Sequence, residues 1–229
     1  MFSETAHLDT WRERALARTL EPARTRSVDR LERLVDAARD LANETGSAAF
    51  TVAQVAARAG VSLKVFYRCF AGKDDLLVAL LEEDSRLGAS ILRDRVDQQG
   101  DRDGPGRIQA YVTGVFELLT LPGALGYAGL LVREERRLAE SRPEDLQRAL
   151  APMIDLLTTE IEAAAASGAA SSADPTRDAR AVFALLLDGI HEVARGGAQP
   201  LEVAAFLWRF CWGGLHGTKG LPRDPEELR

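Results

Sequence analysis

Apolar residues recur along most of this chain at intervals of three and four, the period of a helix with one buried face. A first run lies at residues 28–44, and its apolar stripe consists of Val28, Leu31, Leu34, Val35, Ala38, Leu41 and Ala42. A longer run lies at 73–96, with leucines at 76, 77, 80, 81 and 87. Strand-like alternation is hard to find, so the pattern predicts an all-α protein.

Further helices are predicted in the second half, at about 107–121, 124–140, 143–167, 175–195 and 200–216. Proline and glycine mark most of the joins, because both residues begin or end helices. A surface loop is expected at 100–107 and a loose tail at 217–229. Residues 1–26 are polar and Arg-rich, with a short helix expected at 9–20; they form either a mobile or packed extension or an arm that contacts DNA.

Residues 51–70 carry the most specific local pattern, two short helices joined by a tight turn. Thr51 and Gln54 fit a capping box at the start of the first helix. Gly60 can adopt the left-handed conformation that ends this helix, and Ser62 can cap the next one. This is the pattern of a helix-turn-helix, whose second helix enters the major groove of DNA.

The second of these helices has two chemically different faces. Phe66 and Phe70 lie four residues apart and share a face that is predicted to be buried. The opposite face carries Leu63, Lys64, Tyr67 and Arg68. The formal charge of the chain is −6, but no Asp or Glu occurs between residues 45 and 73, so this surface is predicted to be locally cationic. Local charge governs phosphate binding, since exposed charges more than about 10 Å apart are largely screened at 0.1 M salt.

This run resembles the DNA-binding domain of TetR-family transcriptional regulators. The family pattern is a Thr-capped helix, an Ala-Gly-Val-Ser turn, and a Tyr-containing helix that ends in an aromatic residue, followed by Lys, acidic or polar residues and two leucines. The chain supplies these in the same order and spacing, as Thr51, Ala59-Gly60-Val61-Ser62, Tyr67, Phe70 and Lys73-Asp74-Asp75-Leu76-Leu77. Lys64 and Val65 stand where the family usually has a small residue and Thr, which leaves the operator sequence open.

The resemblance implies a division of the chain into an N-terminal extension (1–27), a three-helix DNA-binding domain (28–88), a helical ligand-binding and dimerisation domain (89–216) and a tail (217–229). It implies a ligand-released repressor that binds a palindromic operator as a homodimer. Base-edge contacts are expected from Leu63, Lys64 and Val65, with Arg68 at a base or a phosphate. Phosphate contacts are expected from Thr51, Ser62, Tyr67 and Lys73.

The last two predicted helices suggest how such a dimer forms. The segment 175–195 is apolar on two sides, and a helix of this kind needs two neighbours, such as its own domain and another subunit. The segment 200–216 carries large aromatic residues at the same excess. The predicted dimer interface consists of Val182, Leu186, Ile190, Val193, Phe206, Trp208 and Trp212; packing within one subunit is the alternative.

A largely apolar pocket for a small molecule is expected between the DNA-binding domain and these helices. Candidates for its wall are Tyr111, Phe116, Tyr127, Leu131, Met153, Leu157 and Phe183. Asp188 and His191 lie one turn apart on an otherwise apolar helix. They could orient a ligand, bond to each other or lie at the dimer seam.

Composition narrows the remaining classes of function. No apolar run approaches the roughly 20 residues needed to cross a bilayer, and no signal peptide is evident. Cys69 and Cys211 are far apart, which fits a reducing cytoplasm. The sequence has no G-x-S-x-G, Walker, H-E-x-x-H, G-x-G-x-x-G or zinc-spaced Cys motif, so we expect no enzyme activity, cofactor or metal. The alternatives are a ligand-binding or enzymatic helical domain with a head of another use, and non-specific DNA coating.

Overall fold

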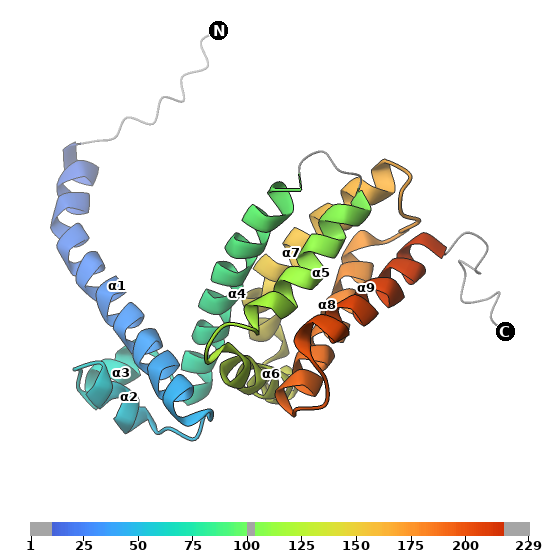
Figure 1. Ribbon diagram of the computed structural model, residues 1–229. Coiled ribbons are helices and arrows are strands. Elements are labelled where there is room, and N and C mark those ends of the chain that lie inside the picture. The colour runs from blue at the N-terminus through green and yellow to red at the C-terminus, as the bar shows by residue number, and fades with distance from the viewer. Residues whose placement is uncertain (1–10, 100–103, 218–229) are drawn as a thin grey trace, which may run out of the picture.

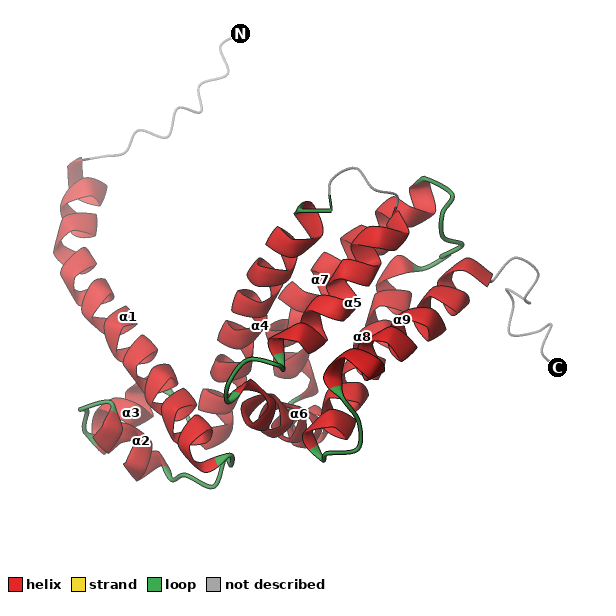
Figure 2. Ribbon diagram, viewed as in Figure 1, coloured by secondary structure: helices red, strands yellow, loops and turns green. Residues whose placement is uncertain are grey.

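The computed structural model describes residues 11–99 and 104–217, with side chains described from Arg24 onward (Figure 1). All regular secondary structure in this part of the chain is helical, and Figure 2 shows helices joined by short loops. The helices are α1 (Trp11–Thr45), α2 (Val52–Arg58), α3 (Leu63–Cys69), α4 (Lys73–Asp97), α5 (Gly104–Leu118), α6 (Ala124–Ser141), α7 (Pro143–Ala166), α8 (Pro175–Ala194) and α9 (Pro200–Gly217). The all-α prediction is confirmed. No described helix is both long and apolar enough to span a bilayer.

Helix α1 differs most from the sequence-based prediction. It continues from Trp11 to Thr45 without the expected break between a short helix and residue 28. Val28 and Leu31 were predicted to be buried, but they are 43% and 37% exposed. The part of α1 that carries them projects beyond α2 and α3 (Figure 1). The apolar stripe is buried only from Leu34 onward.

The N-terminal helices form a small head around one apolar core. Buried residues of α1, α2, α3 and the first half of α4 meet there, with Phe66 fully buried. This core is not closed by the head alone. Leu130 and Leu138 of α6 and Leu146 of α7 belong to the same cluster and are 1%, 0% and 4% exposed.

The second half of α4 joins the head to a bundle that also contains α5, α7, α8 and α9, while α6 lies across one end of it (Figure 1). Close packing of α8 depends on Gly189, because a Cβ there would lie 2.8 Å from Leu207 and 2.9 Å from Phe116. Helix α5 begins at Gly104, so residues 104–107 are helical and not loop as predicted. Pro105 explains this, since proline is favoured in the first turn of a helix.

Candidate DNA-binding surface and internal cavity

Local hydrogen bonds build the two short helices of the head. The Thr51 side chain accepts a hydrogen bond from the backbone N–H of Gln54 at 3.2 Å, and the Gln54 side chain accepts one from the N–H of Thr51 at 2.7 Å. The predicted capping box is therefore present. Ser62 caps α3, since its Oγ accepts a hydrogen bond from the N–H of Val65 at 3.3 Å. These caps fix where α2 and α3 begin, and with it the direction in which α3 points.

The turn between α2 and α3 depends on Gly60, which has a φ of +66°. An added Cβ would meet no atom within 4 Å. The requirement for glycine therefore comes from the backbone conformation, which residues with a Cβ adopt at a cost.

We expect Gly60→Ala to lower the free energy of unfolding by about 1–2 kcal/mol, because the left-handed conformation disfavours a Cβ. Gly72→Ala is the matched control, since Gly72 has a φ of −178° and an equally open Cβ position. Urea denaturation followed by circular dichroism compares the two variants. Equal effects would show that the turn conformation is not what selects glycine.

The two faces of α3 are as different as the sequence predicts. Phe66 and Phe70 are buried, with ring centroids 5.8 Å apart, and hold the helix against the head. Tyr67 is 59% exposed and Leu63 47% exposed on the opposite side. Lys64 and Arg68 are also exposed there, and Val65 is half-buried. Neither Lys64 nor Arg68 has an acidic partner among the described residues.

Two other basic residues of this region have partners within the chain. Arg58 forms a bidentate ion pair with Glu44, with both N–O distances at 2.8 Å. The amine of Lys73 donates a hydrogen bond to the carbonyl of Ala48 and lies 4.9 Å from the ring centroid of Phe50. The loop before α2 therefore engages the amine of Lys73, and the contact of Lys73 with a phosphate stays a prediction. Of the four basic residues, Lys64 and Arg68 of α3 have no such partner among the described residues.

The second candidate site is a cavity of about 250 Å³ between α4, α5, α6, α7 and α8. It is lined by Leu81, Asp84, Ser85, Gly88, Val115, Leu118, Leu119, Ala124, Tyr127, Ala128, Leu131, Val132, Glu135, Leu150, Met153, Phe183, Leu187 and Ile190. Most of this wall is aliphatic or aromatic. Such a wall binds apolar groups, and its few polar residues orient them.

A chain of polar contacts leads from the cavity wall to α1. The Tyr127 hydroxyl donates to one carboxylate oxygen of Asp84 at 2.6 Å, and the Arg39 guanidinium donates to the other at 3.1 Å. Burial raises the pKa of Asp84, whereas the hydrogen bond from Tyr127 and the charge of Arg39 lower it. Asp84 and Tyr127 line the cavity and Arg39 belongs to α1 of the head, so one network joins the cavity wall to the head.

The helix-turn-helix region also matches known proteins. A family model described as "Bacterial regulatory proteins, tetR family" matches residues 34–80. The HTH-type transcriptional regulator BetI of Klebsiella pneumoniae is 37% identical over 89 residues, which cover 38% of this chain and 45% of that relative. Residues 34–80 are thus similar to the helix-turn-helix segment of TetR-family regulators. The match of this chain to the curated relatives spans less than half of their length.

Solved structures extend the likeness beyond the helix-turn-helix to most of the fold. The regulator FadR of Bacillus subtilis, in complex with stearoyl-CoA, is similar with a TM-score of 0.65 at 17% identity, over 81% of this chain and 99% of that one. A TetR-family regulator from Rhodococcus sp. gives a TM-score of 0.62 at 21% identity, over 80% and 96% of the two chains. These solved structures share the overall fold of this chain.

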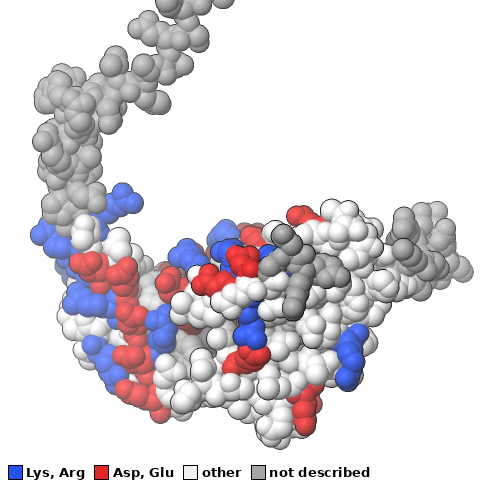
Figure 3. Space-filling model, turned by 45° about the horizontal axis from the view of Figure 1, so that its top comes forward, with Lys and Arg blue, Asp and Glu red and all other residues white. Residues whose placement is uncertain are grey.

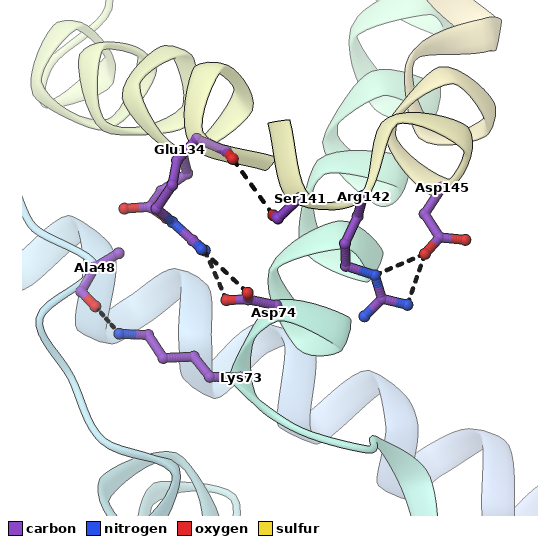
Figure 4. A network of polar contacts seen from close by, with 8 residues as sticks. Ala48, Lys73, Asp74, Glu134, Ser141, Arg142 and Asp145 are labelled. Atoms are coloured by element: carbon purple, nitrogen blue, oxygen red, sulfur yellow. Dashed lines mark hydrogen bonds and ion pairs between the residues drawn. The ribbon is translucent and has the colours of Figure 1, made fainter. Parts of the chain in front are cut away.

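Helix α6 contacts both the cavity and the head. Its first half lines the cavity, and its second half faces the first turn of α4 (Figure 4). Arg137 forms two hydrogen bonds to Asp74 at 2.6 and 3.1 Å. Arg142, just after α6, pairs with Asp75 at 3.2 Å and with Asp145 at 2.6 Å. A movement of α6 would therefore reach the residues that directly follow α3.

The structure brings together only some of the residues that the sequence suggested for a pocket. Tyr127, Leu131, Met153 and Phe183 line the cavity. Three others are core residues away from it, and these are Tyr111, Phe116 and Leu157, all fully buried. The hydroxyl of Tyr111 donates to the carbonyl of Met153 at 3.0 Å, which satisfies it within the core.

Asp188 and His191 do not line the cavity. The Asp188 side chain is 75% exposed and lies 3.5 Å from Arg136. His191 is half-buried on the same helix, and no hydrogen bond between the described residues joins it to Asp188. The suggested role of this pair in orienting a ligand is therefore not supported by its position.

Three polar wall residues, Asp84, Ser85 and Glu135, were missed by sequence reasoning. Ser85 is 5% exposed and its Oγ has no hydrogen-bond partner among the described residues. It carried a signal, because it interrupts the apolar stripe of α4 between Leu81 and Ala89. Glu135 carried none, since it belongs to a run of charged residues on α6.

The predicted dimer residues of α8 are buried within their own subunit. Val182, Leu186, Ile190 and Val193 are between 0% and 9% exposed. Their assignment to a dimer interface is corrected, because α8 finds its neighbours in α6, α7 and α9 of the same chain. Trp208 and Trp212 of α9 stack with ring centroids 5.3 Å apart and pack half-buried on the same core. Of the predicted set, Phe206 alone lies well exposed, at 57%.

Proposed function

We propose that this protein is a sequence-specific DNA-binding transcriptional regulator of the TetR family, a repressor that binds a palindromic operator as a homodimer and leaves it when a small molecule fills the cavity. It acts by binding and not by catalysis. One observation carries the proposal above the others. The α3 face with Lys64, Tyr67 and Arg68 is exposed and has no acidic partner, while Phe66 anchors the opposite face.

The side chains of α3 suit different parts of a DNA duplex. Lys64 lies near the start of the helix with Leu63 and Val65, where recognition helices contact base edges. Arg68 lies one turn further and can reach a base or a phosphate. Hydroxyl groups at the ends of the short helices, those of Thr51, Ser62 and Tyr67, are exposed and suit phosphate oxygens.

Dimerisation is supported by the outer side of α9. Phe206 and Phe210 are 57% and 61% exposed, and their rings stack with centroids 6.2 Å apart. Leu201 of the same helix is 51% exposed. Figure 3 shows mixed charges along α1 and a broad uncharged area on the side where α9 lies. A second copy packed on this area by two-fold symmetry would present two α3 helices to one duplex.

Release by a ligand is supported by the position of the cavity. Its wall includes Asp84 and Tyr127, which contact Arg39 of the head, and α6, which is tied to α4 through Arg137 and Asp74. The solved FadR of the same fold contains stearoyl-CoA. A ligand that binds better to an arrangement of the heads that DNA disfavours lowers DNA affinity, by the same factor as DNA lowers ligand affinity. Coupling of about 1–3 kcal/mol changes affinity about 5–150-fold.

The DNA-binding proposal is tested by fluorescence anisotropy with DNA from upstream of the protein's own gene and with random DNA of equal length. We expect at least about 10³-fold tighter binding to the upstream DNA at physiological salt. Equal affinity for the two would reject operator-specific binding and leave non-specific coating.

Variants of α3 then separate the two kinds of contact. We expect Lys64→Ala to relax discrimination at one operator position by about 1–3 kcal/mol, since it removes a base contact. Arg68→Ala is expected to weaken binding and, where it contacts phosphate, to lower the slope of log affinity against log salt by about 1. Arg93→Ala is the control, because Arg93 is equally exposed but lies on α4 away from α3. Unchanged site preference in Lys64→Ala would contradict its role.

A further inference from the structure

The electrostatic character of the cavity limits the kind of molecule that can enter it. Among the described residues that line it, none is Arg, Lys or His, whereas two are acids, Asp84 and Glu135. An anion would be buried there without a cationic partner, which carries a high desolvation cost. Fatty acids, phosphates and other anions are therefore poor candidates for this cavity.

The two acids of the wall are in different states of pairing. Asp84 is engaged on both oxygens, by Tyr127 at 2.6 Å and by Arg39 at 3.1 Å. Glu135 has no hydrogen bond or ion pair among the described residues. Burial raises the pKa of Glu135, and the charge of neighbouring Arg136 only partly opposes this. Arg136 itself lies 3.5 Å from Asp188 and does not line the cavity.

An uncharged polar group in the same wall is also without a partner. Ser85 is more than nine-tenths buried, and its Oγ makes no hydrogen bond to any described residue. An unsatisfied hydroxyl in an apolar wall is costly, and a ligand that donates a hydrogen bond would remove this cost. Ser85 therefore points independently to a bound molecule with a hydrogen-bonding group, and an N–H group would use the acceptor lone pairs of its Oγ.

We propose that the cavity takes a compact lipophilic amine in its protonated form, with Glu135 as its counter-ion, Ser85 as an acceptor for an N–H group and the apolar wall around its body. This inference rests on the proposed function, because it names the class of molecule that would release the DNA. A volume of about 250 Å³ lies just below the range of about 300–1,000 Å³ usual for small-molecule sites. The ligand is therefore small.

Four naphthalene compounds of nearly equal size test the charge preference by isothermal titration calorimetry on the full-length protein at neutral pH. They are 1-naphthylmethylamine, which is a cation, 1-naphthalenemethanol and 1-ethylnaphthalene, which are neutral, and 1-naphthoate, which is an anion. We expect the amine to bind about tenfold more tightly than the alcohol, since a hydrogen bond to a charged group is stronger than one between neutral groups. The anion is expected to bind most weakly.

Three variants assign the preference to named residues. Glu135→Gln is expected to remove most of the advantage of the amine over the alcohol, and to leave affinity for ethylnaphthalene within about twofold. Ser85→Ala is expected to weaken the amine and the alcohol about fivefold relative to ethylnaphthalene. Glu140→Gln is the matched control, because it makes the same charge change at an exposed position of α6 outside the cavity. Thermal melting checks that each variant is folded.

The results separate this inference from the proposed function. Anion binding equal to amine binding, an amine preference that survives Glu135→Gln, or no binding of any compound at about 1 mM would overturn the amine inference. Operator affinity measured with and without the amine tests the other proposal. Tight amine binding that leaves operator affinity unchanged would support the cation site and reject ligand release through it.

Discussion

Replacing Phe206 and Phe210 together by glutamate is expected to convert the proposed dimer into monomers and to lower operator affinity by about a hundredfold or more. Each phenylalanine can bury on the order of 150–250 Å². Their rings stack on the exposed side of α9, where no described residue covers them. In a two-fold dimer the glutamates of both subunits would lie at one buried seam without cationic partners, which is strongly unfavourable. A monomer would then bind one half-site only.

Sedimentation velocity at micromolar concentration measures the first effect, and fluorescence anisotropy with operator DNA the second. Leu87→Glu is the control, because Leu87 is 57% exposed on α4 and so makes the same change from an exposed apolar residue to an acid. It should leave the dimer intact. Persistence of the dimer in the double variant would place the interface elsewhere, and a monomeric wild type would remove the symmetric-operator proposal.

Phe66→Ala is expected to lower the free energy of unfolding of the head by about 3–5 kcal/mol, because a fully buried aromatic ring leaves a cavity in a small core. Tyr67→Ala is the matched comparison, since Tyr67 is the next residue of the same helix and is 59% exposed. Its loss should change stability by less than about 0.5 kcal/mol. Both variants should bind operator DNA weakly, one through unfolding and the other through a lost contact.

Urea denaturation followed by circular dichroism separates these two causes, with anisotropy measured under conditions in which Tyr67→Ala is fully folded. Wild-type stability in Phe66→Ala would show that the ring does not hold α3. Wild-type DNA affinity in Tyr67→Ala would instead place the binding face elsewhere on the head.

The helix-turn-helix could be predicted from the sequence because its signals are local. The hydrogen bonds of Thr51 and Gln54, the turn at Gly60 and the contact between Phe66 and Phe70 all join residues within a few positions of one another. Each follows from backbone geometry and helical period, which a sequence displays directly.

Contacts between distant residues could not be predicted in this way. Glu44 and Arg58 are 14 positions apart, and Lys73 and Ala48 are 25 apart. Nothing local therefore indicated that two of the four basic residues pair with other residues of the chain. The number of basic residues between 45 and 73 therefore overstated the cationic surface that is free to bind DNA.

The same limit explains the errors in the helical domain. The two apolar sides of α8 correctly indicated two neighbours, but periodicity does not reveal whether a neighbour belongs to the same chain. Tyr111 and Tyr127 have equally helical surroundings, yet only Tyr127 lines the cavity, because the difference depends on where helices diverge. A wall residue is recognised from three-dimensional packing and not from its spacing.

The apolar core of the head is completed by Leu130, Leu138 and Leu146, which lie outside the segment that reads DNA. The reading segment is therefore not a module that can be cut out and attached to another sensor without loss. A chimaera that joins this head to the helical domain of another protein must also keep the leucines of α6 and of the start of α7. Without them, one apolar side of the head would be exposed to solvent. The stability of the head and that of the helical domain are thus coupled in this chain, through one shared patch of side chains.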